Sequence, residues 1–215
     1  MESRPPSIVI AVDGPAASGK GTIARALARH YDLPHLDTGS LYRAVGLAML
    51  LEDADTSDAA AATAAARDFH YELLSAPALR EARTSQAASI VAVHPGVRAA
   101  LLERQRAFAA LPGGAVLDGR DIGTVIAPDA VAKLFVTANP EVRAERRRAE
   151  LASRGEHRPF EVVLADIQAR DARDAGREIA PTMQAADAAL LDTSDLAIDA
   201  AVRRAVELVE ARINR

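Results

Sequence analysis

Short apolar runs alternate with longer amphipathic stretches along the chain. The apolar runs are rich in Val, Ile, Leu and Ala, which is typical of strands buried on both faces; they cover residues 7–13, 115–118, 131–138 and 188–191. In the longer stretches apolar residues recur every three or four positions, as on one face of a helix. These helices are predicted at residues 19–31, 40–51, 53–67, 95–110, 140–153, 160–175 and 196–213. The alternation predicts an α/β fold with a mostly parallel sheet covered by helices on both faces.

The pattern is weakest between residues 53 and 95. Beyond the alanine-rich helix at residues 53–67, we predict a short strand at residues 69–74, before Pro77 breaks the chain. We expect this stretch to form a small lobe beside the main sheet. Because no repeat or long linker interrupts the 215 residues, one domain with insertions is the simplest account.

Composition and charge limit the possible functions. The chain has no cysteine, so it can form neither a disulfide nor a thiolate metal site, which suits a reducing cytoplasm. Its start, MESRPPS, lacks the basic region and apolar core of a signal peptide, and no apolar run approaches the roughly 20 residues that span a bilayer. The net charge of -4 does not favour a broad nucleic-acid-binding surface. We therefore expect a cytoplasmic protein that binds neither membranes nor nucleic acids.

The first apolar run leads into a glycine-rich loop. Residues 14–20, GPAASGK, fit G-x-x-x-x-G-K between a strand and a helix. Small residues let backbone N–H groups point inward, the helix start adds partial positive charge, and Lys20 can reach outer phosphates. The alternative is a glycine-rich turn with an incidental lysine. The predicted triphosphate site comprises Gly14, Pro15, Ala16, Ala17, Ser18, Gly19, Lys20, Gly21 and Thr22.

The residues after Lys20 narrow the kind of phosphate site. Gly21 stands where a hydroxyl residue usually follows the lysine, and the hydroxyl comes one position later, at Thr22. This G-K-G-T ending resembles nucleoside monophosphate kinases more than GTPases or motor ATPases. Guanine specificity lacks support, since no N-K-x-D run occurs. We expect Thr22 to contribute to a Mg²⁺ site at the triphosphate.

Two further clusters are candidates for binding an acceptor. In DTGSLYR, at residues 37–43, Thr38 and Arg43 lie at a helix start, where Arg43 could clamp a phosphate. DGRD, at residues 118–121, follows an apolar strand, and ligands of parallel sheets bind at such strand ends. There Asp118 could hold Mg²⁺ through water, while Arg120 and Asp121 suit an amino-bearing base. The alternatives are a surface arginine near a helix cap and an ion-paired turn.

Two arginine-rich segments in the second half of the chain add further candidates. Arg170, Asp174 and Arg177 are spaced i, i+4 and i+7, so they share one face if the helix continues that far. Arg146 and Arg147 could flank ATP. For both sets the alternative is a solvated, ion-paired helix surface.

Taken together, GPAASGKGT, DTGSLYR, VLDGRDIGT and RDARDAGR, spread over residues 14–177, resemble the bacterial cytidylate kinase family. The resemblance implies a three-layer P-loop nucleoside monophosphate kinase fold, in which ATP with Mg²⁺ donates its γ-phosphoryl group to CMP or dCMP. It also implies a monomer with a core, an acceptor-binding insertion and a lid. We expect the core at about residues 1–52, 96–150 and 178–215, the insertion at 53–95 and the lid at 151–177.

The resemblance also assigns roles to single residues. Lys20, Arg120, Arg170 and Arg177 are expected to be catalytic, because they would screen the charge that spreads over the transferring group. The acceptor phosphate has a second pKa of about 6, so no general base is required. The acceptor set comprises Thr38, Arg43, Ser89, Arg98, Arg120, Asp121, Arg170, Asp174 and Arg177. A kinase of another small acceptor, such as UMP, AMP or shikimate, and a non-enzymatic nucleotide-binding module are the competing hypotheses.

Overall fold

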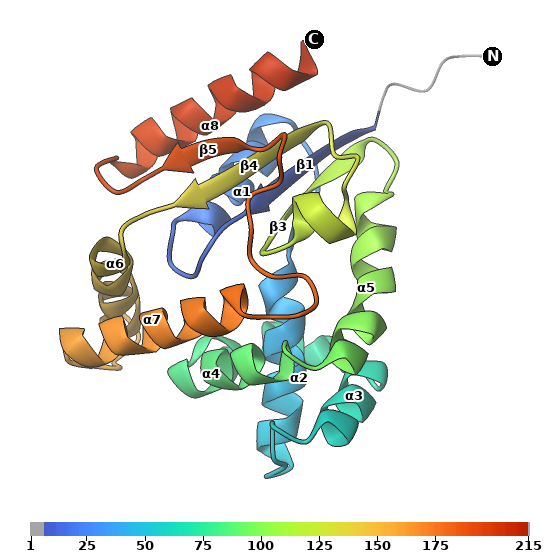
Figure 1. Cartoon of the computed structure of the whole chain (residues 1–215), viewed down its shortest axis with the longest axis vertical. Coiled ribbons are helices and arrows are strands. Elements are labelled where there is room, and N and C mark those ends of the chain that lie inside the picture. Colours follow the sequence, from blue (N-terminus) through green and yellow to red (C-terminus); the bar gives the residue numbers. More distant parts are fainter. Residues whose placement is uncertain (1–6, 215) are drawn as a thin grey trace.

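A computed structural model describes residues 7–214 and has a parallel sheet at its centre (Figure 1). Within this range the sheet has the order β2-β3-β1-β4-β5, and every neighbouring pair is parallel. The strands are β1 (Ile8–Asp13), β2 (His35–Asp37), β3 (Gly114–Gly119), β4 (Ala132–Thr137) and β5 (Ala189–Asp192). The four predicted strands of the main sheet are thus confirmed, and the three residues of β2, directly before α2, supply the fifth.

Helices cover both faces of the sheet. Because side chains alternate along a strand, Ile10 and Val12 of β1 face one layer and Ala11 faces the other. The first layer contains α1 (Lys20–His30) and α8 (Ile198–Ile213), and the second contains α5 (Pro95–Ala109) and the short π-helical turn η3 (Ile122–Ile126). This burial on both faces explains why the strands appear in the sequence as continuous apolar runs.

A second group of helices extends away from the sheet, toward the bottom of Figure 1. Its central element is α2, which packs along α4 and against α3, with Met49 and Val91 fully buried between them. The group consists of α2 (Thr38–Leu51), α3 (Ala59–Arg67), α4 (Ala82–Val91) and the 3-10 turns η1 (Tyr71–Ser75) and η2 (Pro77–Arg80). Apart from α2, which the prediction placed in the core, the group covers the stretch 53–95 in which we expected a small lobe. The role of this lobe as an acceptor-binding insertion stays a prediction.

A pair of helices, α6 (Pro140–Ala152) and α7 (Phe160–Ala175), lies beside the sheet and has its own apolar core. Leu151 of α6 and Val163 of α7 are each 1% exposed. Ala17 of the glycine loop and Ala82 of α4 pack against this core. The helix pair therefore touches both the sheet side and the lobe side of the molecule.

Several predicted elements differ from the structure. The strand at residues 69–74 is wrong: η1 occupies this position, because a helical turn lets the consecutive Leu73 and Leu74 both face the lobe core, which a strand would not. The helix predicted at 53–67 begins at Ala59, where the Asp58 side chain caps it by accepting from two backbone amides at 2.8 and 3.1 Å. The helix α4 was not predicted, because its small and polar residues form no clear apolar stripe.

The structure does not describe the two ends of the chain. Residues 1–6 and 215, which belong to the predicted core and include most of the MESRPPS start, lie outside the described residues. In the part of the chain that the structure describes, no helix is both long and apolar enough to cross a membrane.

Candidate active site

The carboxyl ends of β1, β2 and β3 lie at one edge of the sheet and open into a cavity of about 640 Å³. Its walls come from the glycine loop, the β3 end and helices α1, α2, α4, α6 and α7. The cavity brings together most of the predicted site residues: Ala16, Ala17, Lys20, Gly21, Thr38, Arg43, Ser89, Arg98, Asp118, Arg120, Asp121, Arg147, Arg170, Asp174 and Arg177. The predicted residues that do not line it are Gly14, Pro15, Ser18, Gly19, Thr22 and Arg146.

The glycine loop fits tightly against the strand next to β1. Gly14 has a φ of +146°, and a Cβ at this position would lie 2.0 Å from the carbonyl oxygen of Val136. Gly19, with a φ of +91°, forms the left-handed cap before α1. Gly14 therefore requires glycine because of the clash with β4, whereas Gly19 favours glycine because of its positive φ alone.

Thr193 and Arg146 support the loop from behind. The Thr193 hydroxyl donates to the Ser18 carbonyl oxygen at 2.9 Å, and Arg146 donates to the Thr193 hydroxyl and carbonyl oxygens at 2.9 and 2.6 Å. Arg146 is therefore bound to the segment after β5 instead of pointing into the cavity. Arg147, its neighbour, does line the cavity.

Lys20 lines the cavity at the start of α1, where the glycine loop ends, and is partly buried. Burial and the nearby Arg120 guanidinium lower the pKa of Lys20 to about 7, although Asp118 and Asp37 oppose this shift. A polyanion placed at Lys20 would favour the charged ammonium and so raise this pKa again. The loop is thus poised to gain electrostatic energy when phosphate groups arrive.

Arg143, which the sequence analysis did not select, ties the glycine loop to α7. Its side chain is 4% exposed and donates to the carbonyl oxygens of Ala16 and Ala138 at 3.2 and 2.8 Å. It also forms a two-pronged ion pair with Asp171, at 3.1 and 2.6 Å. In the sequence it is one of several arginines on the same helix, so its spacing gave no signal.

Opposite the loop, Asp174 is the centre of a buried cluster of three arginines. Its Oδ2 accepts from Arg120 Nε at 2.9 Å and lies 3.9 Å from Arg170 Nε, while its Oδ1 pairs with Arg177. Burial alone would raise the pKa of Asp174, but the arginines outweigh it and lower the pKa. One carboxylate therefore partly neutralises three guanidinium groups, which leaves excess positive charge for an anionic ligand.

A second ion pair lies deeper in the same wall. Arg98 and Asp121 pair, with side chains 9% and 7% exposed, and the Arg98 guanidinium lies 5.7 Å from the centre of the Tyr42 ring. The Thr38 hydroxyl donates to the Asp118 carbonyl oxygen at 2.8 Å, which fixes the start of α2 to the end of β3. Arg43 pairs with Asp37 at the cavity mouth. The predicted acceptor residues thus line one cavity, in which ion pairs hold most of their charged side chains.

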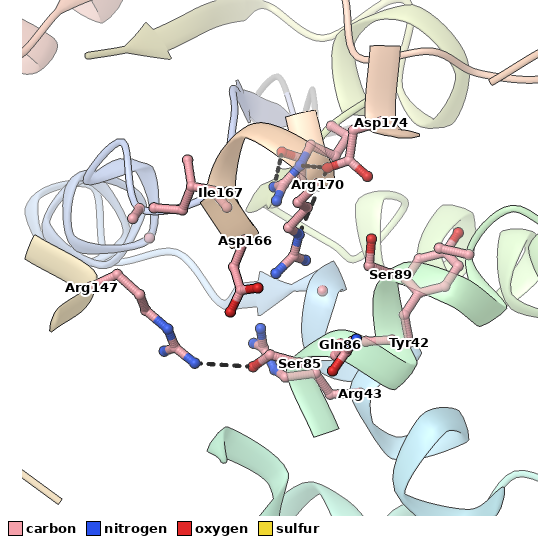
Figure 2. Close-up of a pocket in the computed structure, with 18 of the residues that line it drawn as sticks. Tyr42, Arg43, Ser85, Gln86, Ser89, Arg147, Asp166, Ile167, Arg170 and Asp174 are labelled. Carbon is pink, nitrogen blue, oxygen red and sulfur yellow. Dashed lines mark hydrogen bonds and ion pairs between the residues drawn. The ribbon is translucent and has the colours of Figure 1, made fainter. Parts of the chain in front are cut away.

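Helix α4 faces the helix pair α6–α7 across the cavity. Figure 2 shows Arg170 and Asp166 pointing from α7 into the space beside α4, which carries Ser85, Gln86 and Ser89. Two hydrogen bonds cross this space: Arg147 to the Ser85 hydroxyl at 3.3 Å, and Arg173 to the Ser89 hydroxyl at 3.2 Å. Ser89, a predicted acceptor contact, therefore has an arginine as its partner here.

Several residues that line the cavity or support it were not predicted from the sequence. Asp37, Tyr42 and Arg173 lie inside motifs that it quoted, so position within the motif was the available signal. Gln86 and Arg83 lie in or beside α4, where no element was predicted, and therefore gave none. Arg177 lies beyond the end of α7, with Gly176 between, so the shared helix face predicted for residues 170, 174 and 177 is wrong for the last of them.

The donor set for a divalent cation is small. Within residues 7–214 no group of three or more His, Asp or Glu side chains could enclose a metal ion. Asp118 lines the cavity and could contribute to a Mg²⁺ site made mainly by phosphate. Its Oδ1 is already paired with His35 Nε2 at 2.7 Å. Its Oδ2 lies at the start of α1, 3.6 Å from the Cβ position of Gly21, and is the oxygen that could bind the ion. Thr22 is exposed and does not line the cavity.

Comparisons with known proteins give consistent results. Residues 10–211 match the family model described as cytidylate kinase. Similar curated proteins include a cytidylate kinase of Xanthobacter autotrophicus, 62% identical over 205 residues that cover 95% of this chain and 98% of the relative. Another is a cytidylate kinase of Caulobacter sp. strain K31, 56% identical over 209 residues that cover 96% of this chain and 97% of the relative.

Solved structures support the fold. An uncharacterized protein from Eubacterium ventriosum matches with a TM-score of 0.57 at 15% identity, covering 96% of this chain and all of that one. A gluconokinase from Sinorhizobium meliloti matches with a TM-score of 0.50 at 18% identity, covering 96% and 94%. At such low identity these matches show a shared fold and nothing about the activity or the substrate.

Proposed function

We propose how the cavity is divided between two nucleotides in this chain, which belongs to the cytidylate kinase family and has that family's activity. The two nucleotides are its substrates, ATP and CMP. The glycine loop and Lys20 bind the phosphates of ATP. The wall formed by Arg98, Asp121 and the Asp174 cluster binds CMP or dCMP. The supporting observation is that Lys20 and this arginine wall line one cavity, close enough that, in addition to burial, the charges of Arg120 and Arg170 help to lower the pKa of Lys20.

On the donor side, the loop from Gly14 to Thr22 supplies backbone N–H groups at a helix start, where an anion is favoured. Arg147 adds a positive charge at the rim. Arg146 contributes indirectly, since it holds the Thr193 segment that supports the loop. Asp118, through water, would hold Mg²⁺, which would reduce the charge of the ATP phosphates; the contribution of Thr22 stays a prediction, because this residue is exposed and does not line the cavity.

On the acceptor side, Asp121 and Arg98 read the cytosine, whose exocyclic amine donates and whose ring nitrogen accepts. Thr38, Arg43 and Ser89 contact the same nucleotide from α2 and α4. Asp174 accepts from a sugar hydroxyl, and since both CMP and dCMP retain a 3′ hydroxyl, both are acceptors. Ser89 must exchange its bond to Arg173 for one to the ligand.

Transfer requires charge screening and no general base. At neutral pH an oxygen of the acceptor phosphate is already ionised, because the second pKa of a phosphate monoester is about 6. Lys20 and Arg120 then screen two approaching polyanions, and Arg170 and Arg177 complete the set around the transferring group. Burial and Arg120 lower the pKa of Arg170, so an arriving anion stabilises its charged form.

We further propose that residues 151–177 act as a lid, because α7 brings Arg170 and Asp174 over the cavity from a separate helix pair. Closure of this segment would exclude water, which otherwise could accept the phosphoryl group. We also propose that the protein is cytoplasmic, in line with the cysteine-free sequence, and that it is a monomer, as the family resemblance implies.

Two variants test the division of the cavity. We expect Lys20→Ala to lower kcat by about 10³-fold or more, because it removes the cation that faces the phosphates. We expect Asp121→Ala to weaken CMP at least about tenfold while ATP binding changes less than about threefold. Circular dichroism would verify the fold, and Arg204→Ala, an exposed position, serves as the control. Turnover near the wild-type value in Lys20→Ala, or equal loss of both nucleotides in Asp121→Ala, would contradict the proposal.

A further inference from the structure

Asp13 is the last residue of β1 and directly precedes the glycine loop, yet its carboxylate does not line the cavity. The residue is 4% exposed. Its two oxygens accept separate backbone hydrogen bonds, from Ile122 N and Gly123 N, both at 2.8 Å. Asp13 therefore adjoins the glycine loop in the sequence, but its side chain binds the segment after β3.

The partners of Asp13 are the first two amides of a helical turn. In η3, the Asp121 carbonyl accepts from Val125 and Ile126, so Ile122 and Gly123 begin the turn with amides that no earlier carbonyl of that turn can receive. The usual solution is a side-chain cap from the preceding residue, here Asp121. Asp121 makes no such bond, because its carboxylate is turned to Arg98.

The sheet register makes this cap possible. Asp13 pairs with Gly119, so its side chain reaches the turn that starts three residues after its partner. The Gly123 position is closely surrounded: a Cβ there would lie 3.1 Å from Lys133 Cδ, a tight contact, and 3.4 Å from Asp13 Oδ2, an ordinary one. The Lys133 ammonium is itself engaged with Asp187 at 2.8 Å.

We propose that Asp13 is a positioning residue for the acceptor site: by capping the turn in place of Asp121, it frees the Asp121 carboxylate to face the cavity. Without this cap, the two buried amides would lose their acceptors, and Asp121, the residue before the turn, is placed to accept from the Gly123 amide at the second position of the turn. Its carboxylate would then leave Arg98. Asp13 thus fixes the geometry of Arg120 and Asp121 relative to the donor loop that it precedes.

The inference rests on the proposed role of Asp121 in binding CMP, and the test separates the two. Asp13→Asn keeps the shape of the side chain but turns one acceptor oxygen into an N–H donor, which faces an amide donor. We expect CMP affinity, measured by titration calorimetry at pH 8, where the Asp13 carboxyl is mostly ionised, to fall by about tenfold or more, the effect of losing one hydrogen bond to a charged group. ATP affinity should change by less than about threefold. Hydrogen exchange should accelerate in residues 118–126 and stay unchanged in residues 14–22.

The matched control is Asp58→Asn, because Asp58 also accepts two amides at a helix start, at 2.8 and 3.1 Å, but lies outside the cavity. It should leave both nucleotide affinities within about twofold. Equal weakening of ATP and CMP by Asp13→Asn, or unchanged CMP affinity, would overturn the inference. If Asp121→Ala weakens CMP but Asp13→Asn does not, the positioning role alone fails; if Asp121→Ala has no effect on CMP, the proposed acceptor site fails.

Discussion

Replacing Arg143 by methionine should lower the free energy of unfolding more than the same replacement of an exposed arginine. The substitution keeps most of the apolar stem but removes the guanidinium that joins the glycine loop, the start of α6 and helix α7. Three acceptors lose their donor: the carbonyl oxygens of Ala16 and Ala138 and the carboxylate of Asp171. The change therefore tests whether this side chain holds three segments together.

The magnitude follows from burial. Removing one partner of a fully buried ion pair costs about 3–5 kcal/mol, because the other charge stays buried without compensation. The Asp171 side chain is 29% exposed, so water can hydrate it and reduce that part of the loss. The two carbonyl oxygens add to the cost, since a hydrogen bond to a charged group contributes about 1.5–3 kcal/mol. We expect the free energy of unfolding to fall by about 3 kcal/mol.

Urea unfolding followed by circular dichroism measures this change, since the chain has no tryptophan. Arg204→Met is the matched control, because Arg204 and its partner Glu207 have side chains 58% and 60% exposed. Such a pair contributes at most about 1 kcal/mol. A loss below about 1 kcal/mol in Arg143→Met, or one equal to that of the control, would refute the reasoning.

Three further predictions concern stability. Gly14→Ala should lower the free energy of unfolding by about 3 kcal/mol or more, because its Cβ would lie 2.0 Å from the Val136 carbonyl oxygen, whereas Gly113→Ala, with a φ of +88° and no atom within 4 Å, should cost about 1 kcal/mol in the same urea assay. Burial raises the pKa of Asp13 from 3.8 to about 7, so between about pH 4 and pH 7 the folded state holds a proton that the unfolded state has released, and stability falls as pH rises. The melting temperature of the wild type relative to Asp13→Asn should therefore be higher at pH 5 than at pH 8, and a constant difference would contradict this assignment. Asp174→Asn leaves three arginines without their counter-charge, so inorganic phosphate should raise its melting temperature more than that of the wild type; an equal rise would argue against the cluster as an anion site.

Local patterns in the sequence predicted much of the fold because they report burial directly. The apolar run before the glycine loop became β1, and the helical stripe after it became α1, with Ile23 and Leu27 facing the sheet. The motif residues converged on one cavity because strand ends of a parallel sheet share an edge. Where small residues blur the periodicity, as in α4, the sequence predicted no element.

Contacts between distant residues were beyond the reach of such patterns. Asp13 and Ile122 are 109 positions apart, and Arg143 and Asp171 are 28 apart on different helices. Nothing in local spacing distinguishes Arg143, which is buried, from Arg148, which forms an exposed pair with Glu145. These partners become visible only when the register of β1 with β3 and the packing of α6 on α7 are known.

We propose that the arginine wall around Asp121 and Asp174 selects a cytidine monophosphate as acceptor for the phosphoryl group held at Lys20. The most direct measurement is a coupled ADP-release assay in which ATP is offered CMP, dCMP, UMP and AMP separately. Our account predicts the highest kcat/KM with CMP and dCMP, with UMP and AMP lower, and that Asp121→Ala narrows this difference. A preference for UMP or AMP, or ADP release that does not depend on any acceptor, would contradict it.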